Sequence, residues 1–347
     1  MNFLDIYNKR INLKSFVFEI TQRCNHNCLF CYNVWKCKKY PEGEISSEEW
    51  KGLIRKLKAE TKVKLISLSG GEPLLRKDLV ELINFMRSEK ISSNLITNGS
   101  LITEKIAMDV VDVGVSVFEI ALHTSKENVY NRMTRTKNFK KMLEGIANVK
   151  QFDGKLVTVI VATKYNIKDV SETVEMAIAL GSDAVMFNRF NPGGMGIKYM
   201  KQLLPSVKEL RDAFQTLNRM SEEYGIAITS SVPVQPCLID MKEYDRLNFG
   251  YCPSGNDKSY FTIDSLGNVR VCNHSPTILG DFKKQSFKEI FENSFVDKFK
   301  QVIPEFCSDC KMKEICRGGC KASAEVFYGC VECEDPFLEL NKGYIKK

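Results

Sequence analysis

The sequence predicts an α/β protein in which an incomplete (β/α)6 barrel is followed by a small cysteine-rich domain. Two observations carry this prediction. In the first two thirds, short apolar runs rich in β-branched residues alternate with stretches of helical periodicity, an order that gives a parallel sheet covered by helices. In the last third the alternation stops, and most of the 13 cysteines lie there.

A chain of 347 residues is long enough for one large domain and one small one. We expect an N-terminal segment over 1–13, the barrel over 14–225 and the cysteine-rich domain over 226–347. Six strands are expected in the barrel. They lie near Val17 to Thr21, Val63 to Ser69, Ser92 to Thr97, Val115 to Leu122, Leu156 to Ala162 and Ala184 to Phe190.

Helix signals fall between and after these strands. Ser46 is a good N-cap because glutamates follow it in the first helical turn, and Thr103 caps a later helix. Gly181 stands where a further helix should end. Pro205 begins a helical stretch that runs to about Tyr224 and should pack on the outside of the barrel.

Composition narrows the class of protein. The net charge of +7 is spread along the chain without a basic block, so we expect no nucleic-acid partner, although acidic partners are mildly favoured. The N-terminus lacks the apolar run of a secretory signal, and no 18 apolar residues follow one another. We therefore expect a cytoplasmic protein without membrane contact. Cysteines in that reducing compartment seldom form disulfides, which favours metal ligation.

The loop after the first strand carries Cys24, Cys28 and Cys31. In a barrel of parallel strands the reactive groups sit on such loops. Three thiolates this close can hold three irons of a four-iron cluster and leave the fourth iron open. A zinc knuckle or a disulfide is the alternative, but zinc sites usually use two Cys-x2-Cys pairs and only one is local here.

The turn after the second strand reads Ser69, Gly70, Gly71, Glu72, Pro73. Two glycines let the backbone approach a ligand closely, and Glu72 can accept a hydrogen bond from a cationic amine. Taken alone, this turn is a common loop.

Together, the Cys-x3-Cys-x2-Cys loop with Phe30 before its last cysteine and the Gly-Gly-Glu-Pro turn resemble the radical S-adenosylmethionine (SAM) superfamily. The resemblance covers about residues 14 to 200 and implies a partial TIM-like barrel. It implies that the open iron of a [4Fe-4S] cluster binds the amino and carboxylate groups of SAM, and that Ser69 to Glu72 hold the amino group.

Further SAM contacts follow from the same resemblance. They fall at the ends of the third and fourth strands and on the segment after them: Thr97, Asn98, His123, Thr124, Ser125, and either Arg132 or Arg135, of which Arg135 is preferred. A helix cap or a solvated charge is the alternative for each. Thr163, Tyr165 and Asn166, after the fifth strand, are candidate ribose or adenine contacts.

The sixth strand leads into a glycine-rich loop that includes Gly193, Gly194 and Gly196. It lacks the Lys and Ser/Thr of a phosphate-binding loop, which argues against binding of a nucleoside triphosphate. We expect it to shape the substrate opening.

In the last third, two alternating runs from Tyr260 to Val271 meet at a Gly-Asn turn and predict a β-hairpin. The hairpin lies between Cys252 and Cys272, and Cys307-x2-Cys310-x5-Cys316-x3-Cys320 follows. This pattern resembles the SPASM extension of radical SAM enzymes, which binds two auxiliary iron-sulfur clusters, expected here to be [4Fe-4S].

The resemblance assigns Cys252, Cys272 and Cys320 to the inner cluster and Cys307, Cys310 and Cys316 to the outer one. We expect Cys237 as the fourth inner ligand and either Cys330 or Cys333 as the fourth outer one, with Cys333 favoured. In the family the last cysteine commonly follows an Asp-Pro pair, whereas here Asp335-Pro336 comes after both candidates. Cys37 and one C-terminal cysteine are left over. As an alternative, Cys307, Cys310, Cys316 and Cys320 could form one zinc site.

The implied activity is that of a radical SAM oxidoreductase. SAM is cleaved reductively to a 5′-deoxyadenosyl radical, which abstracts a hydrogen atom from a peptide or protein side chain, so that a ribosomally made peptide matures by oxidation or cross-linking. An oxidative step also needs a general base. The sequence does not identify that base: Asp264, His274 and Glu119 are candidates by residue type. His26, inside the cysteine loop, is expected to form hydrogen bonds, and His274 could equally support the Cys272 ligand.

The expected partners are a peptide substrate and an electron donor of the flavodoxin or ferredoxin type. The cysteine loop begins close to Met1, so we expect no N-terminal peptide-recognition domain; leader binding then either needs a separate protein or does not occur. Two other functions stay open: dehydrogenation of a small molecule such as an aminocyclitol, and a non-catalytic iron-sulfur carrier or scaffold.

Overall fold

The computed structural model describes residues 10–36, 39–254 and 259–345. Cys37 and most of the predicted N-terminal segment lie outside the described residues. One sheet of 11 strands has the order β11-β10-β9-β1-β2-β3-β4-β5-β6-β7-β8. All neighbours from β9 to β8 are parallel, whereas β10 and β11 are antiparallel.

The predicted strands are confirmed within two residues, and the sheet is wider than predicted. β7 and β8 extend it beyond β6, while β9 extends it on the other side of β1. The strands are β1 Ser15–Thr21, β2 Leu65–Gly70, β3 Ser92–Thr97, β4 Val117–Ala121, β5 Leu156–Ala162, β6 Ala184–Arg189, β7 Ala227–Ser230, β8 Leu247–Phe249, β9 Tyr260–Ile263, β10 Asn268–Arg270 and β11 Gly280–Asp281. The predicted β-hairpin is β9 and β10.

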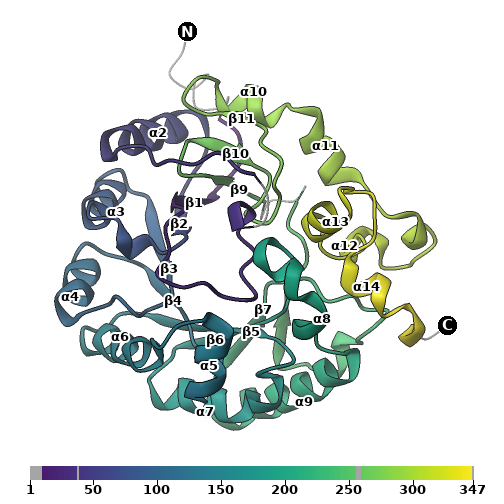
Figure 1. Ribbon diagram of the computed structural model, residues 1–347. Helices are drawn as coiled ribbons and strands as arrows, with labels where there is room; N and C mark the ends of the chain where they lie inside the picture. The colour runs from purple at the N-terminus through teal and green to yellow at the C-terminus, as the bar shows by residue number, and fades with distance from the viewer. Residues whose placement is uncertain (1–9, 37–38, 255–258, 346–347) are drawn as a thin grey trace.

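Helices surround the curved sheet (Figure 1). Ser46 and Thr103 cap α2 and α4 as predicted, and Ser206 caps α9 directly after Pro205. The helices are α2 Ser47–Glu60, α3 Leu79–Ser88, α4 Glu104–Asp112, α5 Glu127–Thr134, α6 Phe139–Gln151, α7 Val170–Ala179, α8 Met200–Leu203, α9 Val207–Tyr224, α10 Phe287–Phe291, α11 Ser294–Gln301, α12 Lys313–Cys316, α13 Lys321–Tyr328 and α14 Pro336–Leu340.

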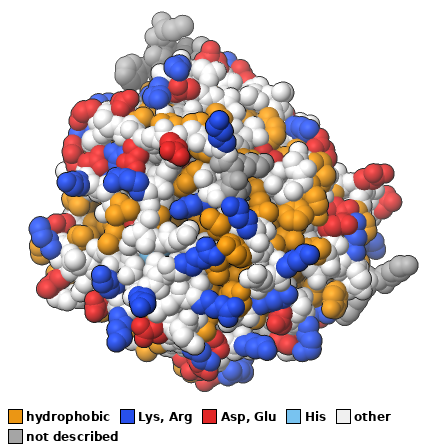
Figure 2. All heavy atoms as spheres, in the orientation of Figure 1, with side chains coloured by type: hydrophobic (Ala, Val, Ile, Leu, Met, Phe, Trp, Pro, Cys, Tyr) orange, Lys and Arg blue, Asp and Glu red, His pale blue; other side chains and the backbone are white. Residues whose placement is uncertain are grey.

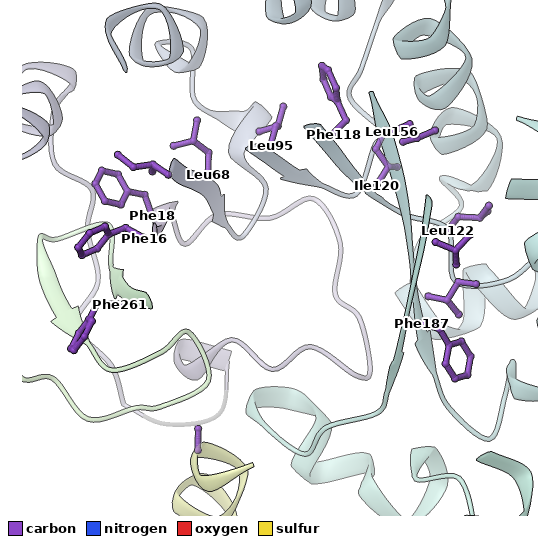
Figure 3. Close-up of a cluster of buried hydrophobic side chains, with 14 of the residues drawn as sticks. Phe16, Phe18, Leu68, Leu95, Phe118, Ile120, Leu122, Leu156, Phe187 and Phe261 are labelled. Carbon is purple, nitrogen blue, oxygen red and sulfur yellow. The ribbon is translucent and has the colours of Figure 1, made fainter. Parts of the chain in front are cut away.

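The main core lies between the sheet and these helices. On β1, Phe16 and Phe18 are buried and point outward, and the ring of Phe18 stacks on Trp50 of α2 at 4.8 Å between centroids (Figure 3). Because side chains alternate along a strand, Val17 and Glu19 face the inside of the curved sheet. The residues available for chemistry therefore lie on the inner face and on the loops after the strands.

The sheet does not close on itself, because β8 and β11 are its two edges. In Figure 1 the segments α11 to α14 occupy the stretch of the ring between β11 and α9, so the cysteine-rich part of the chain completes the wall. Among the described residues, no helix is long and apolar enough to cross a membrane.

Candidate active site

Cys24, Cys28 and Cys31 lie together on the loop that follows β1. Their thiolate charges interact, since Cys24 and Cys31 both raise the pKa of Cys28, although burial is the larger cause. Burial also raises the pKa of Cys31 to about 11. Three partly buried thiols that would repel one another as thiolates fit a site neutralised by bound iron. The donor set therefore suits the predicted cluster.

Helix α5 anchors the cysteine loop through the backbone. The N–H groups of Asn27 and Leu29 donate to the carbonyl oxygens of Thr134 and Met133, at 3.1 and 2.9 Å. On the other side, the N–H of Gly196 donates to the carbonyl of Cys31 at 3.2 Å. The glycine-rich loop thus packs directly against the cysteine loop.

The two glycines after β2 allow a close approach between backbones. A Cβ atom on Gly71 would lie 2.0 Å from the carbonyl oxygen of Arg23, and Gly70 has a φ of +133°. The N–H of Gly71 donates to Thr21 at 2.7 Å, and that of Glu72 donates to Arg23 at 2.8 Å. These contacts hold the turn after β2 against the end of β1 and the start of the cysteine loop, while the approach of the glycines to a ligand stays a prediction.

Glu72 is fully buried beside that loop. Its carboxylate accepts hydrogen bonds from the hydroxyl of Thr97 at 2.7 Å and from the N–H groups of Asn98 and Leu74, at 2.8 and 3.2 Å. Burial raises its pKa to about 6, although these hydrogen bonds oppose the shift. No Lys, Arg or His among the residues that the structure describes forms an ion pair with Glu72, so its buried carboxylate can take a ligand ammonium group.

A second hydrogen-bond network joins the cysteine loop to the end of β3. The amide of Asn98 donates to Asn25 at 2.8 Å, and Asn25 donates to Ser100 at 3.0 Å. The Nε2 atom of His26 lies 3.1 Å from the amide nitrogen of Asn138. Burial lowers the pKa of His26 to about 4, so its imidazole is neutral and can accept this hydrogen bond. His26 therefore forms structural hydrogen bonds, as expected.

The three candidate contacts after β4 have different surroundings. His123 is buried with its ring edge-on to Phe30 at 4.6 Å, so it packs against the cysteine loop. The hydroxyl oxygen of Thr124 accepts a hydrogen bond from the N–H of Lys126 at 3.2 Å, which fixes the turn before α5. Among the described residues, the buried hydroxyl of Ser125 has no hydrogen-bond partner, which leaves it open to a ligand.

The two candidate arginines stack on tyrosines. The guanidinium of Arg132 lies 4.0 Å from the ring centre of Tyr165, and that of Arg135 lies 4.8 Å from the ring centre of Tyr199. Arg135 also donates a hydrogen bond to the Tyr199 hydroxyl. Both cations are thus oriented by the loops after β5 and β6.

Thr163 and Asn166 are engaged with each other. The Asn166 carbonyl oxygen accepts from the hydroxyl of Thr163 at 2.8 Å, and its amide donates to the carbonyl of His123 at 2.6 Å. These contacts fix the turn after β5.

The inner face of β1 carries a charged group that the sequence analysis missed. Glu19 is bonded to Arg270 of β10, and both side chains are buried. Burial raises the pKa of Glu19 to about 7, with Arg270 opposing the shift. One oxygen of Glu19 has no hydrogen-bond partner among the described residues. A glutamate inside an apolar strand was the signal that could have revealed it.

The three candidate bases have different surroundings. Asp264 accepts hydrogen bonds from the Tyr40 hydroxyl at 2.8 Å and from the N–H groups of Leu266 and Asn268, both at 2.9 Å, so it holds the hairpin turn. Glu119 is partly buried, and the loss of solvent around it raises its pKa. His274 stacks on Tyr32 of the cysteine loop at 4.0 Å.

Cys252, Cys272 and Cys320 form one group. The charges of Cys320 and Cys252 both act on Cys272, whose pKa is raised mainly by burial. Asn191, after β6, donates to the sulfur of Cys320 at 3.2 Å, and its amide nitrogen lies 3.3 Å from Nδ1 of His274. This group is therefore connected to the cysteine loop through His274 and Tyr32.

Cys307, Cys310 and Cys316 form a second group, and Cys237 lies with them. Burial is the main cause of the raised pKa of Cys307 and of Cys316. The thiolate charges of Cys237 and Cys310 raise the pKa of Cys307 further, and those of Cys237 and Cys307 raise the pKa of Cys316. We expected Cys237 to be the fourth ligand of the inner cluster, but in the structure its cysteine neighbours are those of the outer set. The segment that carries it is held against the C-terminal part of the chain by the hydrogen bond from Gln235 to Asp335 at 2.9 Å.

The structure also differs from the expected role of Cys333. Cys330 and Cys333 form a disulfide, with their Cα atoms 5.4 Å apart. A sulfur in that bond is not a thiolate ligand. The alternative zinc site is divided as well, because Cys320 lies in the other group. Among the described residues, no three His, Cys, Asp or Glu side chains surround a point that suits a single metal ion.

Comparison with known proteins agrees with this architecture. A family model for the radical SAM superfamily matches residues 18–177, and the SPASM model, an iron-sulfur cluster-binding domain, matches residues 252–320. The PqqA peptide cyclase of Bradyrhizobium diazoefficiens is 27% identical over 334 residues, which covers 94% of this chain and 86% of that protein. The AdoMet-dependent heme synthase of Methanosarcina barkeri is 25% identical over 341 residues, covering 94% and 96%.

A solved structure shares the fold. Streptococcus suis SuiB bound to its precursor peptide SuiA superposes with a TM-score of 0.75 at 15% sequence identity, covering 96% of this chain and 77% of that one. The paired domain matches and the cysteine groups lead to the same assignment: the chain belongs to the radical SAM superfamily and carries a C-terminal SPASM domain.

Proposed function

We propose that this protein is a radical SAM oxidoreductase that matures a ribosomally made peptide by oxidation or cross-linking. The observation that supports it best is the gathering of three partly buried thiols on one loop, one of which, Cys24, is close enough to the buried carboxylate of Glu72 to be affected by its charge. That pairing provides ligands for an iron-sulfur cluster and an acceptor for the ammonium group of SAM. We further propose 14–225 as the barrel domain and 226–347 as the SPASM domain.

Within this proposal Cys24, Cys28 and Cys31 hold a [4Fe-4S] cluster. When bound, the cluster and SAM together supply a 5′-deoxyadenosyl radical that abstracts a hydrogen atom. The protein's own part is to place SAM and substrate. Glu72 binds the amino group, and the Ser125 hydroxyl and Arg135 are available to the remaining polar groups.

Glu19 is the side chain best suited to hold a proton near the substrate. Its pKa of about 7 allows it to exchange protons near neutral pH, and one of its oxygens has no partner among the described residues. Arg270 fixes its other oxygen. Glu119 is a second inward carboxyl group on the same sheet.

The peptide assignment draws on the relatives. One relative is named a peptide cyclase, and the SuiB structure holds a precursor peptide. In addition, lysine and arginine side chains gather across the middle of the face that carries α5 and α8 (Figure 2). These cations favour a substrate with acidic residues. A flavodoxin- or ferredoxin-type donor and a separate leader-binding protein complete the proposal.

The test uses the full chain, reconstituted with iron and sulfide without oxygen. Reduced protein and SAM are incubated with the product of a neighbouring short open reading frame. We expect 5′-deoxyadenosine and a peptide that has lost two hydrogens, both detected by mass spectrometry. Replacing Cys24, Cys28 and Cys31 by Ala should abolish both products. Persistence of 5′-deoxyadenosine in that triple variant would contradict the proposal.

A small-molecule substrate is the competing outcome, since one relative is named a heme synthase. Formation of 5′-deoxyadenosine without any change in the peptide, together with turnover of an added small molecule, would favour that alternative. A protein that binds clusters but makes no 5′-deoxyadenosine would be a carrier or scaffold.

A further inference from the structure

The segment after β7 is a tight turn that ends beside the SPASM domain. The N–H groups of Leu238 and Ile239 both donate to the carbonyl oxygen of Gln235, at 3.0 and 3.1 Å. From helix α9, Arg211 donates to the carbonyl of Leu238. Cys237 lies inside this turn, so its position is fixed from the barrel side.

A buried hydrogen-bond centre fixes the same turn against the SPASM domain. One oxygen of Asp335 accepts from the amide of Gln235 at 2.9 Å and from the N–H of Cys320 at 2.8 Å, and it also pairs with Arg189 of β6. Gly319 packs so tightly there that a Cβ atom would lie 2.2 Å from the Gln235 amide nitrogen. Gln235, which precedes Cys237 by two residues, therefore touches the loop between Cys316 and Cys320.

The result is a group of four sulfurs from two distant parts of the chain. Cys237 interacts electrostatically with Cys307, Cys310 and Cys316. The C-terminal cysteines are engaged elsewhere, because Cys330 and Cys333 are bonded to each other. After them come Asp335, whose carboxylate is fully used, and the buried apolar side chains of Phe337 and Leu338.

We infer that Cys237 supplies the fourth sulfur ligand of the outer auxiliary cluster and that Cys330 and Cys333 ligate no cluster. The inference rests on the proposed pair of auxiliary clusters. Four thiolates complete the coordination of a four-iron cluster and leave no iron open to a substrate. The outer cluster would then join the segment after the barrel to the loop of residues 307–316.

The test measures metal content and spectra, which do not depend on turnover. The full chain, a Cys237→Ala variant and a matched Cys330→Ala/Cys333→Ala variant are reconstituted in parallel without oxygen. We expect Cys237→Ala to lose the iron and sulfide of one cluster, or to hold a three-iron cluster visible by electron paramagnetic resonance. The matched double variant should keep the iron content of the unaltered chain. The opposite pattern would overturn the inference.

A second measurement covers the case in which Cys237→Ala does not fold. Folding is followed by the change that SAM causes in the spectrum of the reduced cluster on Cys24, Cys28 and Cys31. If that change is lost, the unaltered holoprotein is alkylated before and after iron removal, and its peptides are mapped. Cys237 should react only after iron removal, whereas Cys330 and Cys333 should react after mild reduction alone. Alkylation of Cys237 in the holoprotein would overturn the inference. If the unaltered chain binds only enough iron for one cluster, the proposed auxiliary clusters would be wrong instead.

Discussion

The carboxylate of Glu19 on β1 is bonded to the guanidinium of Arg270 on β10, 251 positions later in the chain. Both side chains are buried, so neither charge is solvated by bulk water. Burial in low dielectric makes each charge depend on the other. The pair therefore ties the strand that leads into the cysteine loop to the first hairpin of the SPASM domain.

Glu19→Gln should be strongly destabilising. It leaves the buried Arg270 without its nearest anion, and we expect a loss of about 3 kcal/mol in the free energy of unfolding. Denaturant unfolding measures it. As a control, Asp109→Asn breaks the exposed Lys105–Asp109 pair on α4 and should cost less than about 1 kcal/mol. Equal losses in the two variants would show that the buried pair is not needed for stability.

Gly71→Ala should disrupt the cysteine loop. The added methyl group would meet the Arg23 carbonyl oxygen at 2.0 Å, and a backbone atom cannot move aside as a flexible side chain can. We expect loss of the iron bound by Cys24, Cys28 and Cys31 after reconstitution, measured as iron per chain. Gly52→Ala is the matched control: nothing lies within 4 Å of its added methyl group on α2, and it should stabilise the protein by up to about 1 kcal/mol. Full iron content in Gly71→Ala would contradict the prediction.

SAM affinity should depend on pH through Glu72. Its pKa of about 6 in the SAM-free protein means that the carboxylate is protonated at lower pH and cannot pair with an ammonium group. Below about pH 6 the affinity should therefore fall by about tenfold for each pH unit, and above it the affinity should level off. Titration of the reconstituted protein by isothermal calorimetry measures this. The Glu72→Gln variant should bind SAM weakly, and its affinity should not change with pH around 6. If the fall in affinity below about pH 6 persists in this variant, another group causes it.

The same carboxyl group should affect folding stability with the opposite sign. Its folded pKa of about 6 exceeds the ordinary value of 4.5, so the folded protein holds the proton more tightly. Stability contributed by Glu72 is thus fully present below pH 4.5 and falls by about 2 kcal/mol in total as the pH rises from below 4.5 to above about 6. The stability difference from Glu72→Gln should show this fall in denaturant unfolding. A difference that is flat with pH would contradict it.

Local signals in the sequence predicted the barrel well. The strands from β1 to β6 lie in short apolar runs separated by helical stretches, and Ser46 and Thr103 cap helices as their neighbours indicated. The wider sheet could not be read this way. β7 and β8 are only four and three residues long, and β9 pairs with β1 across most of the chain, so no local pattern encodes their partners.

The site shows the same division. Spacing along one loop was sufficient to group Cys24, Cys28 and Cys31. It could not place Cys237, because the turn that carries this cysteine is fixed by the hydrogen bond from Gln235 to Asp335, which lies 100 residues later in the chain. The disulfide of Cys330 and Cys333 was also contrary to expectation. The rule that disulfides are rare in a reducing compartment describes proteins on average, and it does not determine the state of a single Cys-x2-Cys pair.

The parallel pairing of β9 with β1, in which Ser15 faces Tyr260 and Phe18 faces Ile263, has a consequence for biosynthesis. The ribosome synthesises β1 long before β9. The edge of β1 that pairs with β9 therefore has no partner strand during most of translation. We expect the growing chain to be prone to aggregation at this exposed strand edge until the C-terminal hairpin has docked, which would make it a client of holding chaperones.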